Sequence, residues 1–465
     1  MSGRTIVVAA CLALLALCAP AAGAATQQQV ATATSAASQW IASQQDPATG
    51  EIPNFGGDWS LSALAAAGVN AADLGGPSAQ DFYLGLWNGA DWTPVPDPTT
   101  GMNVSFYVDT DFERAIMLAH AAGLQPSRLS ADQNLVAQLA ALYDAPDGAF
   151  TAPSLNGNTF GLFALAPEHA PHALLAKLAA YVRANRHDDG GWTYTPVTSP
   201  ADAAAPSDVD MTGAAIGALC TAGATPDDPY VAGGIAFLRG KLISATGAFD
   251  AMFGANTDSN AWAIDGLTAC GVDPQSPAWT TADGRTPVDY LLSLQRASGP
   301  GAGSFKYDPT EDDAAQPSLY VTQDALRALA AGGFVVDPPA RADVADPRVR
   351  PAPTVADGTS VPLALAIDDG AGDVRLCRVT ALTGSTVADV LSAAQANAVP
   401  AGCVTAVGTT GGAVTSVDGA AGDWLASVDG GPESPAGTQT VGLGDLVSLR
   451  LPAAGSAQLD ASALA

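Results

Sequence analysis

The chain has 465 residues and a formal net charge of −28 at pH 7, with 14% charged and 48% hydrophobic residues. A negative charge of this size argues against nucleic acid as a partner, because the phosphate backbone would be repelled. The length exceeds what one hydrophobic core usually organises, so two domains are expected.

The N-terminus has the pattern of a secretory signal peptide over residues 1–25. Arg4 supplies the positive charge, an apolar run extends from Ile6 to Leu17, and small residues follow up to the expected cleavage near Ala24 or Ala25. Beyond this leader no stretch is long and apolar enough to cross a bilayer. We therefore expect a secreted protein that is not an integral membrane protein.

Residues 26–336 contain one pattern repeated six times, with a period of about 50 residues. Each repeat has an amphipathic helix, a Gly-rich turn and a second helix of small apolar residues. The turns fall at residues 46–50, 98–101, 147–150, 188–192, 246–249 and 301–305. Six helical hairpins are therefore predicted for this region.

The two helices of each hairpin differ in their apolar pattern. The first has a single apolar stripe, as with Leu174, Leu178 and Val182 against Lys177 and Arg186. The second is apolar nearly all round, as in residues 211–222 and 260–270, and must be buried on every side. Closing the six buried helices into a ring leaves no exposed apolar end faces, which predicts an (α/α)6 toroid with a central cavity.

The mouth of that cavity is expected at the N-terminal ends of the inner helices. Asp111, Asp210, Asn256, Asn260 and Gln323 lie at or near these ends and are candidate ligand-binding residues. The alternative is that such side chains are ordinary N-caps, because Asp, Asn and Thr favour that position.

Four cysteines remain outside the leader, an even number that favours disulfides over metal ligands in an exported protein. Cys220 and Cys270 fall at equivalent ends of successive inner helices, so a disulfide is expected, with two buried free thiols as the alternative. Cys377 and Cys403 flank the helix expected near residues 386–396, and pairing them would stabilise a small second domain. No metal site is predicted.

The chain changes character after the sixth hairpin. Residues 337–353 are rich in Pro, Asp and Arg without periodicity and are expected to be a linker. Residues 354–453 show the alternation of strands, for example Leu363, Leu365 and Ile367, and predict a small β-rich domain with one helix. Residues 454–465 form a tail.

Several runs in this chain resemble the transcobalamin and intrinsic factor family, whose members join a toroid of this kind to a small β domain and hold cobalamin between them. They are LTGSTVADVL at 382–391, TSV at 415–417, Trp424-Leu425 and GDLVSLRL at 444–451, with VDMTGAAIGALC at 209–220 in the toroid. The resemblance implies corrin contacts for Asp210, Asn256 and Asp111, and an aromatic contact for Trp424. Ser207 stands where transcobalamin has its cobalt-binding histidine, so coordination of cobalt from that position is not expected.

The function expected from these features is that of a secreted ligand-binding protein which holds a corrinoid, or another large ligand with a polar rim, between toroid and β domain. No cofactor is required, and the oligomeric state is left open. An enzyme is the rival, because the toroid also resembles squalene cyclases and protein prenyltransferases. Asp208-Val-Asp210 is close to the DxDD acid signature of class II terpene cyclases, although Met211 replaces its last Asp. An extracellular adhesion or scaffold module is the third possibility.

Overall fold

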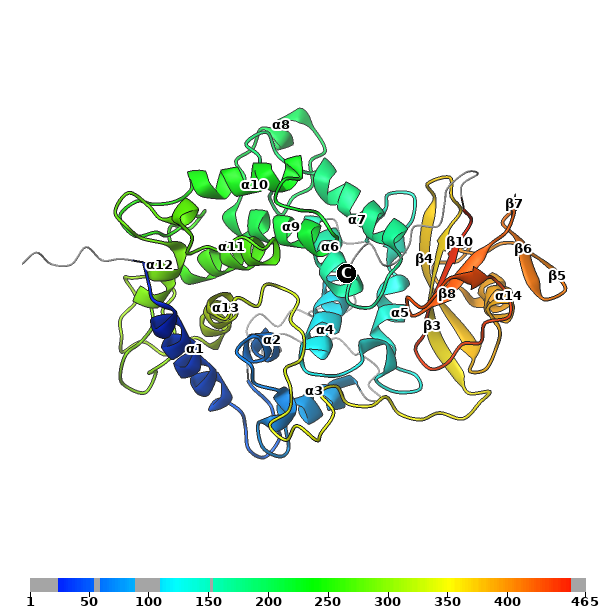
Figure 1. The fold of residues 1–465 in the computed structure, drawn as a ribbon, viewed down its shortest axis with the longest axis horizontal. Coiled ribbons are helices and arrows are strands. Elements are labelled where there is room, and N and C mark those ends of the chain that lie inside the picture. The colour runs from blue at the N-terminus through cyan, green and yellow to red at the C-terminus, as the bar shows by residue number, and fades with distance from the viewer. Residues whose placement is uncertain (1–23, 54–58, 88–108, 151–153, 453–465) are drawn as a thin grey trace, which may run out of the picture.

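A computed structural model describes residues 24–53, 59–87, 109–150 and 154–452. They form a ring of helices with a β-rich domain beside it (Figure 1). The predicted fold class, an (α/α)6 toroid followed by a small β-rich domain with one helix, is confirmed. The turn expected at 98–101 and most of the expected leader and tail lie outside the described residues.

The ring has an inner and an outer layer of helices. The inner helices are α2 (Trp59–Ala66), α4 (Asp109–Ala121), α6 (Leu155–Leu165), α9 (Val209–Thr221), α11 (Thr257–Ala269) and α13 (Leu319–Leu329). The outer helices are α1 (Gln27–Ala42), α3 (Ala79–Trp87), α5 (Leu135–Ala140), α7 (His172–Ala184), α10 (Pro229–Gly240) and α12 (Pro287–Ser293). Each inner helix contacts the next in this order, and α13 contacts α2, so the ring is closed.

Short elements connect the long helices. They are α8 (Pro200–Ala203), the 3-10 turns η1 (Ala71–Asp73), η2 (Pro126–Arg128) and η3 (Pro277–Trp279), and the hairpin β1 (Tyr143–Asp144) and β2 (Ala149–Phe150). The described residues contain no helix that is both long and apolar enough to span a bilayer.

Burial follows the periodicity of the sequence. Helix α6 buries nearly all of its residues, whereas α7 buries one stripe that includes Leu174, Leu178 and Val182. A helix apolar on all sides is stable only inside the ring, and an amphipathic one only at its surface. The predicted assignment to inner and outer layers therefore holds for this pair.

Helices α9 and α11 pack side by side with their backbones in contact. A Cβ atom added to Gly266 would lie 2.0 Å from the carbonyl oxygen of Gly213, so only glycine fits there. Towards their C-terminal ends Cys220 and Cys270 form a disulfide with Cα atoms 5.2 Å apart, which confirms the predicted pair. The two inner helices therefore run parallel and begin at the same end of the ring.

The β domain contains a five-stranded sheet in the order β4-β3-β10-β8-β9 and a three-stranded sheet in the order β5-β6-β7. Its elements are β3 (Ser360–Asp368), β4 (Val374–Leu382), α14 (Val387–Asn397), β5 (Val407–Thr410), β6 (Ala413–Val417), β7 (Ala420–Ala421), β8 (Leu425–Val428), β9 (Ser434–Pro435) and β10 (Leu446–Arg450). Strand β3 is antiparallel to β4 and parallel to β10.

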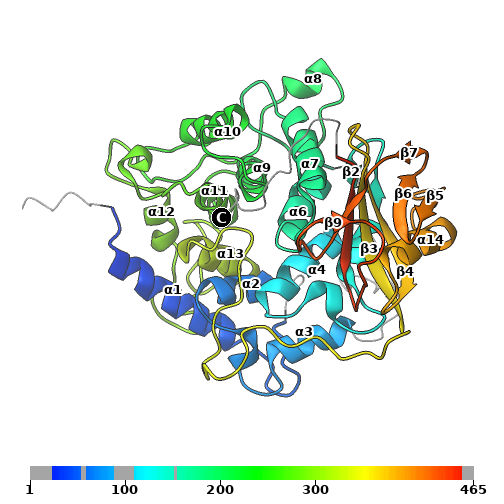
Figure 2. The same cartoon turned by 45° about the vertical axis from the view of Figure 1, so that its right-hand side comes forward.

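Strand β3 joins the two domains through its alternating side chains. Leu363 and Leu365 point into the core of the β domain, whereas Ala364 and Ala366 belong to the hydrophobic core of the ring. The sheet packs on the outer helices α5 and α7 through this second face. Both views place the β domain beside the ring, next to α5 and α7 (Figures 1 and 2).

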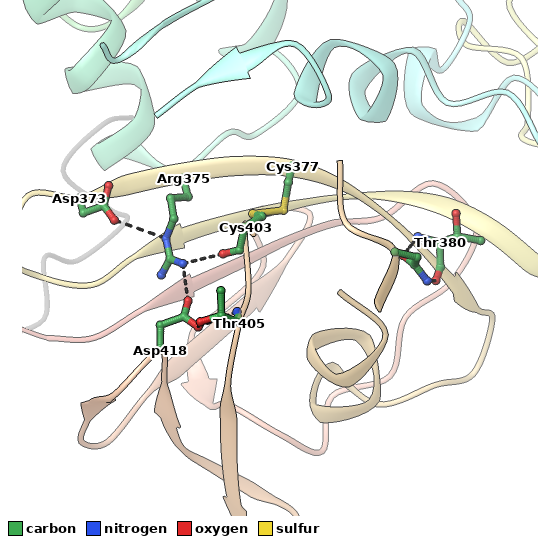
Figure 3. Close-up of a disulfide and its surroundings, with 8 residues drawn as sticks. Asp373, Arg375, Cys377, Thr380, Cys403, Thr405 and Asp418 are labelled. Atoms are coloured by element: carbon green, nitrogen blue, oxygen red, sulfur yellow. Dashed lines mark hydrogen bonds and ion pairs between the residues drawn. A yellow bond between two sulfur atoms is a disulfide. The ribbon is translucent and has the colours of Figure 1, made fainter. Parts of the chain in front are cut away.

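A second disulfide, between Cys377 on β4 and Cys403, is also confirmed. Figure 3 shows Arg375 close to it, with Nη1 donating to the carbonyl oxygen of Cys403 at 2.5 Å and pairing with Asp418. The carboxylate of Asp418 also accepts from the backbone of Thr405 at 2.7 Å. The loop around Cys403 is therefore tied to β4 by one covalent bond and an ion pair.

The segment between the domains is fastened to the ring. Arg341 pairs with Asp73 at 2.7 Å, and Arg350 pairs with Asp81 at 2.7 Å. Asn70 donates to the carbonyl oxygen of Pro339 at 2.8 Å. The β domain is thus not on a free tether, and swinging over the ring would require these contacts to break.

Candidate functional site

The start of α9 combines a cap with a carboxyl group that has a free acceptor. Asp208 is the N-cap and accepts from the backbone N–H of Met211 at 3.0 Å. Two residues on, Asp210 has its Oδ1 shielded from solvent without a hydrogen-bond partner among the described residues. Burial and, after it, the charge of Asp208 raise the pKa of Asp210 to about 7, against the opposing effect of a hydrogen bond with Ser259 on α11.

Asp258 repeats this arrangement on the neighbouring helix α11. Its Oδ1 is also shielded and without a hydrogen-bond partner in the described part of the chain. Burial raises the pKa of Asp258 to about 8, with contributions from Asp324 and Asp210, while Arg327 opposes the rise. Two carboxyl groups on adjacent inner helices therefore hold protons near neutral pH.

Arg327 on α13 is the cation at the centre of this cluster. Its guanidinium is 1% exposed, donates from Nε to Asp265 at 2.8 Å and lies 3.2 Å from Asp324. It also lies over the ring of Trp59, 5.2 Å from the centroid. Asp324 in turn accepts from the indole N–H of Trp262 at 3.0 Å.

Burial raises the pKa of both carboxyl partners of Arg327. For Asp265, burial raises the pKa to about 7 although Arg327 lowers it, and for Asp324 burial raises the pKa against the same opposing cation. Arg327 also lowers the pKa of Asp258, so three carboxyl groups share one guanidinium, and Asp210 adjoins them through the charge of Asp324. Burying several ionised carboxylates beside one cation costs free energy, and protonation of some of them lowers that cost.

A second group of carboxyl groups lies on α4. Glu113 is fully buried, and burial followed by the charges of Asp109 and Asp111 raises its pKa well above the ordinary range. Asp111 lies 3.7 Å from Arg114 with a side chain that is 16% exposed. Asp111 is therefore half-buried near the start of an inner helix, where the sequence predicted it.

Aromatic side chains fill the interior of the ring next to these charged groups. Phe160 packs edge-on against Trp59 and Trp262, with centroids 6.2 and 5.9 Å apart, and Phe334 stacks on Phe163 at 4.8 Å. These five residues, the aromatic floor, come from α2, α6, α11 and the segment after α13. At this depth the central cavity expected from the sequence is filled by side chains.

The side-chain amides of Asn256 and Asn260, which were predicted at the mouth, form hydrogen bonds with backbone groups. Asn256 is the N-cap of α11, accepts from the N–H of Ser259 and donates to the carbonyl oxygen of Gly254. Asn260 accepts from Phe249 and donates to Asn256, so the capping alternative describes these two residues. Gln323 is fully buried, and its Oε1 accepts from Ser60 while Nε2 has no partner among the described residues.

Trp424 is a core residue of the β domain. Its indole is 1% exposed inside the core of the β domain and donates to the carbonyl oxygen of Ala420 at 3.1 Å. The side chain serves the packing of the β domain, and the ligand contact that the resemblance implies stays a prediction. The expected cleft is absent where the described face of β3 meets α5 and α7, since Ala364 and Ala366 are each 1% exposed there.

Asp265, Asp324 and Arg327 were not among the residues proposed from the sequence. A signal was present, because Asp265 interrupts an apolar inner helix and Asp324 and Arg327 are spaced for a pair on one helix face.

A cavity of about 590 Å³ lies elsewhere, along α1, and is lined by residues such as Val30, Thr34 and Gln275. In the described residues no group of three or more His, Cys, Asp or Glu is arranged to hold a metal ion.

No protein family and no curated protein matches this sequence. Solved structures are similar at low identity. The type II terpene cyclase MstE from Scytonema is 16% identical with a TM-score of 0.44, over 67% of this chain and 100% of its own. Haptocorrin in complex with Cbi is 12% identical with a TM-score of 0.38, over 90% of this chain and 96% of its own. The ent-copalyl diphosphate synthase from Streptomyces platensis is 20% identical with a TM-score of 0.38, over 59% of this chain and 50% of its own.

Proposed function

We propose that this chain is a secreted ligand-binding protein whose site is the mouth of the ring, at Asp210 and Asp258. The observation that carries the proposal is the pair of acceptor oxygens, one on each of two neighbouring inner helices, that no donor among the described residues satisfies. Buried acceptors without partners are costly, by about 1 to 3 kcal/mol each, and a ligand with N–H donors would remove that cost. The two disulfides are compatible with an exported protein.

A corrinoid is the ligand class to test first, because its side-chain amides supply such donors and because of the sequence resemblance of the second domain. It would rest at the mouth, above the aromatic floor. Ser207 would not coordinate cobalt, since its hydroxyl donates to Asp189 at 2.5 Å. The protein would therefore recognise the amides of the ligand and not its metal.

The test is equilibrium dialysis of the mature protein against cyanocobalamin and cobinamide, followed by the corrin absorbance. Retention of the spectrum at micromolar protein is expected, and D210N or D258N should weaken binding by roughly 10-fold. D227N is the matched control, because Asp227 is an exposed carboxylate beyond the far end of α9. Absence of any retained corrinoid would exclude this ligand, and full affinity in both variants would exclude the site.

Acid catalysis is the second candidate, because protonated carboxyl groups lie among aromatic rings at the same place. Trp262 bonds Asp324 and packs on Phe160, so a cation formed from an alkene by protonation would be surrounded by ring faces. Here Asp210 would be the acid, and D210N would abolish turnover of a polyprenyl substrate.

The pH dependence separates the two functions. A ligand that donates to carboxylates binds their ionised form, so its affinity should rise as the pH increases through about 7 to 8, the pKa values of Asp210 and Asp258. A catalytic acid must be protonated, so the turnover rate should fall over the same interval. Titration of corrinoid affinity and of turnover between about pH 6 and 9 gives opposite slopes for the two cases.

A further inference from the structure

Arg128, the last residue of η2, connects the ring to two loops of the β domain. Its Nε donates to the carbonyl oxygen of Leu443 at 2.7 Å, and Nη2 donates to Asp445 at 2.9 Å and also pairs with Asp429. The carboxylate of Asp429 is itself fixed by the backbone N–H of Leu446 at 2.8 Å. A single ring side chain thus holds two adjacent loops at one end of the docked sheet, the loop that follows β8 and the loop that precedes β10.

The same two loops approach the ring at glycine residues. A Cβ on Gly444, whose φ is +71°, would lie 2.0 Å from the carbonyl oxygen of Ser127. A Cβ on Gly430, with φ +66°, would lie 2.8 Å from the Cβ of His169. Contacts this close require the loops to be docked, which brings Asp429 and Asp445 next to Arg128 of the ring.

Glu168 is the ring carboxyl group that faces this space. Its side chain is 13% exposed and lies 3.8 Å from Nδ1 of His120, whose Nε2 is 2.9 Å from Asp337 of the linker. Burial and, after it, the charge of Asp429 raise the pKa of Glu168 to about 7, although Arg128 opposes the rise. Burial raises the pKa of Asp445 as well.

We propose that Arg128, Glu168 and Asp429 form a protonation-controlled interdomain latch, which holds the β domain on the ring more tightly at mildly acidic than at alkaline pH. Arg128 carries one positive charge and faces three carboxyl groups, so their negative charges are not fully compensated, and a proton on Glu168 relieves part of the repulsion. Separation of the domains would return Glu168 and Asp429 to water and remove the need for that proton. The docked state therefore binds more protons than the separated state.

The sign of the pH effect follows from this difference. Docking is strongest below the ordinary pKa of a glutamate, weakens as the pH rises towards about 7, and is constant above it. The docking equilibrium should change by at most about tenfold per pH unit within that interval.

Hydrogen exchange of the full-length mature chain, followed by mass spectrometry from about pH 5.5 to 8.5 and corrected for intrinsic rates, tests the latch. Peptides covering residues 126–140 and 428–446 should lose protection as the pH rises, while peptides of α9 and α11 should not. E168Q should stay protected at every pH, and R128M should be less protected at every pH. E51Q, at an exposed glutamate in the first hairpin, should behave like the wild type.

Three results would overturn the proposal. They are equal protection of the wild-type interface across the pH range, an unchanged loss of protection in E168Q, and normal protection in R128M. The wild-type series decides the question by itself if a variant does not fold, and protection of α9 and α11 reports whether the ring is intact.

Discussion

Replacing Arg327 by methionine should destabilise the ring by about 3 to 5 kcal/mol near pH 8, because the buried carboxylates of Asp265 and Asp324 would lose the guanidinium that pairs with them. Methionine fills a similar volume, so little of this loss comes from packing. Without the guanidinium, the pKa values of Asp265 and Asp324 would rise further than burial already raises them. The variant should therefore recover as the pH falls towards 5 and both groups take protons, leaving a loss of about 1 kcal/mol.

Urea unfolding at about pH 5, 7 and 8.5, monitored by tryptophan fluorescence, measures this difference. R341M is the control, since Arg341 pairs with Asp73 at the surface and its loss should cost under about 1 kcal/mol. Adding D265N to R327M should restore part of the stability by removing one uncompensated carboxyl group. A loss below about 1 kcal/mol at alkaline pH, or the same loss at every pH, would refute the reasoning.

Two further predictions concern the contact between α9 and α11. G266A should lower the unfolding free energy by about 1 to 3 kcal/mol, because the new methyl group must push Gly213 away, whereas G240A, which meets nothing within 4 Å, should be neutral or slightly stabilising. Equal melting temperatures for the two variants would contradict the close contact. Replacing Cys220 and Cys270 together by alanine should cost roughly 3 to 4 kcal/mol, since the bond closes a loop of 50 residues. An unchanged urea midpoint under oxidising conditions would speak against that estimate.

The candidate site was only partly predictable from the sequence. Asp210 could be found from its place at the start of an inner helix, and Asp111 for the same reason. Asn256 and Asn260 share that place, yet their amides are used by backbone groups, and a linear pattern does not distinguish a cap from a free acceptor. Trp424 packs in the core of the β domain, and the sequence pattern alone does not show whether an aromatic residue beside a strand faces the core or a ligand.

The local pattern was enough to determine the layers of this protein. Outer helices such as α7 show a single apolar stripe with a period of 3.6 residues, and inner helices such as α6 are apolar all round. Cys220 and Cys270 were paired because they occupy the same position in successive repeats. The apolar pattern of a helix depends on residues within a few turns, and the repeat can be counted along the chain, so both can be predicted from the sequence.

Tertiary structure alone decided which charges meet and where the second domain sits. Arg327 is paired with Asp265, 62 residues earlier, and Arg128 with Asp429, 301 residues later. The pKa of each carboxyl group depends on the burial and the partners that such long-range contacts create. The docking of β3 on the flank of the ring likewise depends on the surface that α5 and α7 present together, which no segment of the sequence contains by itself.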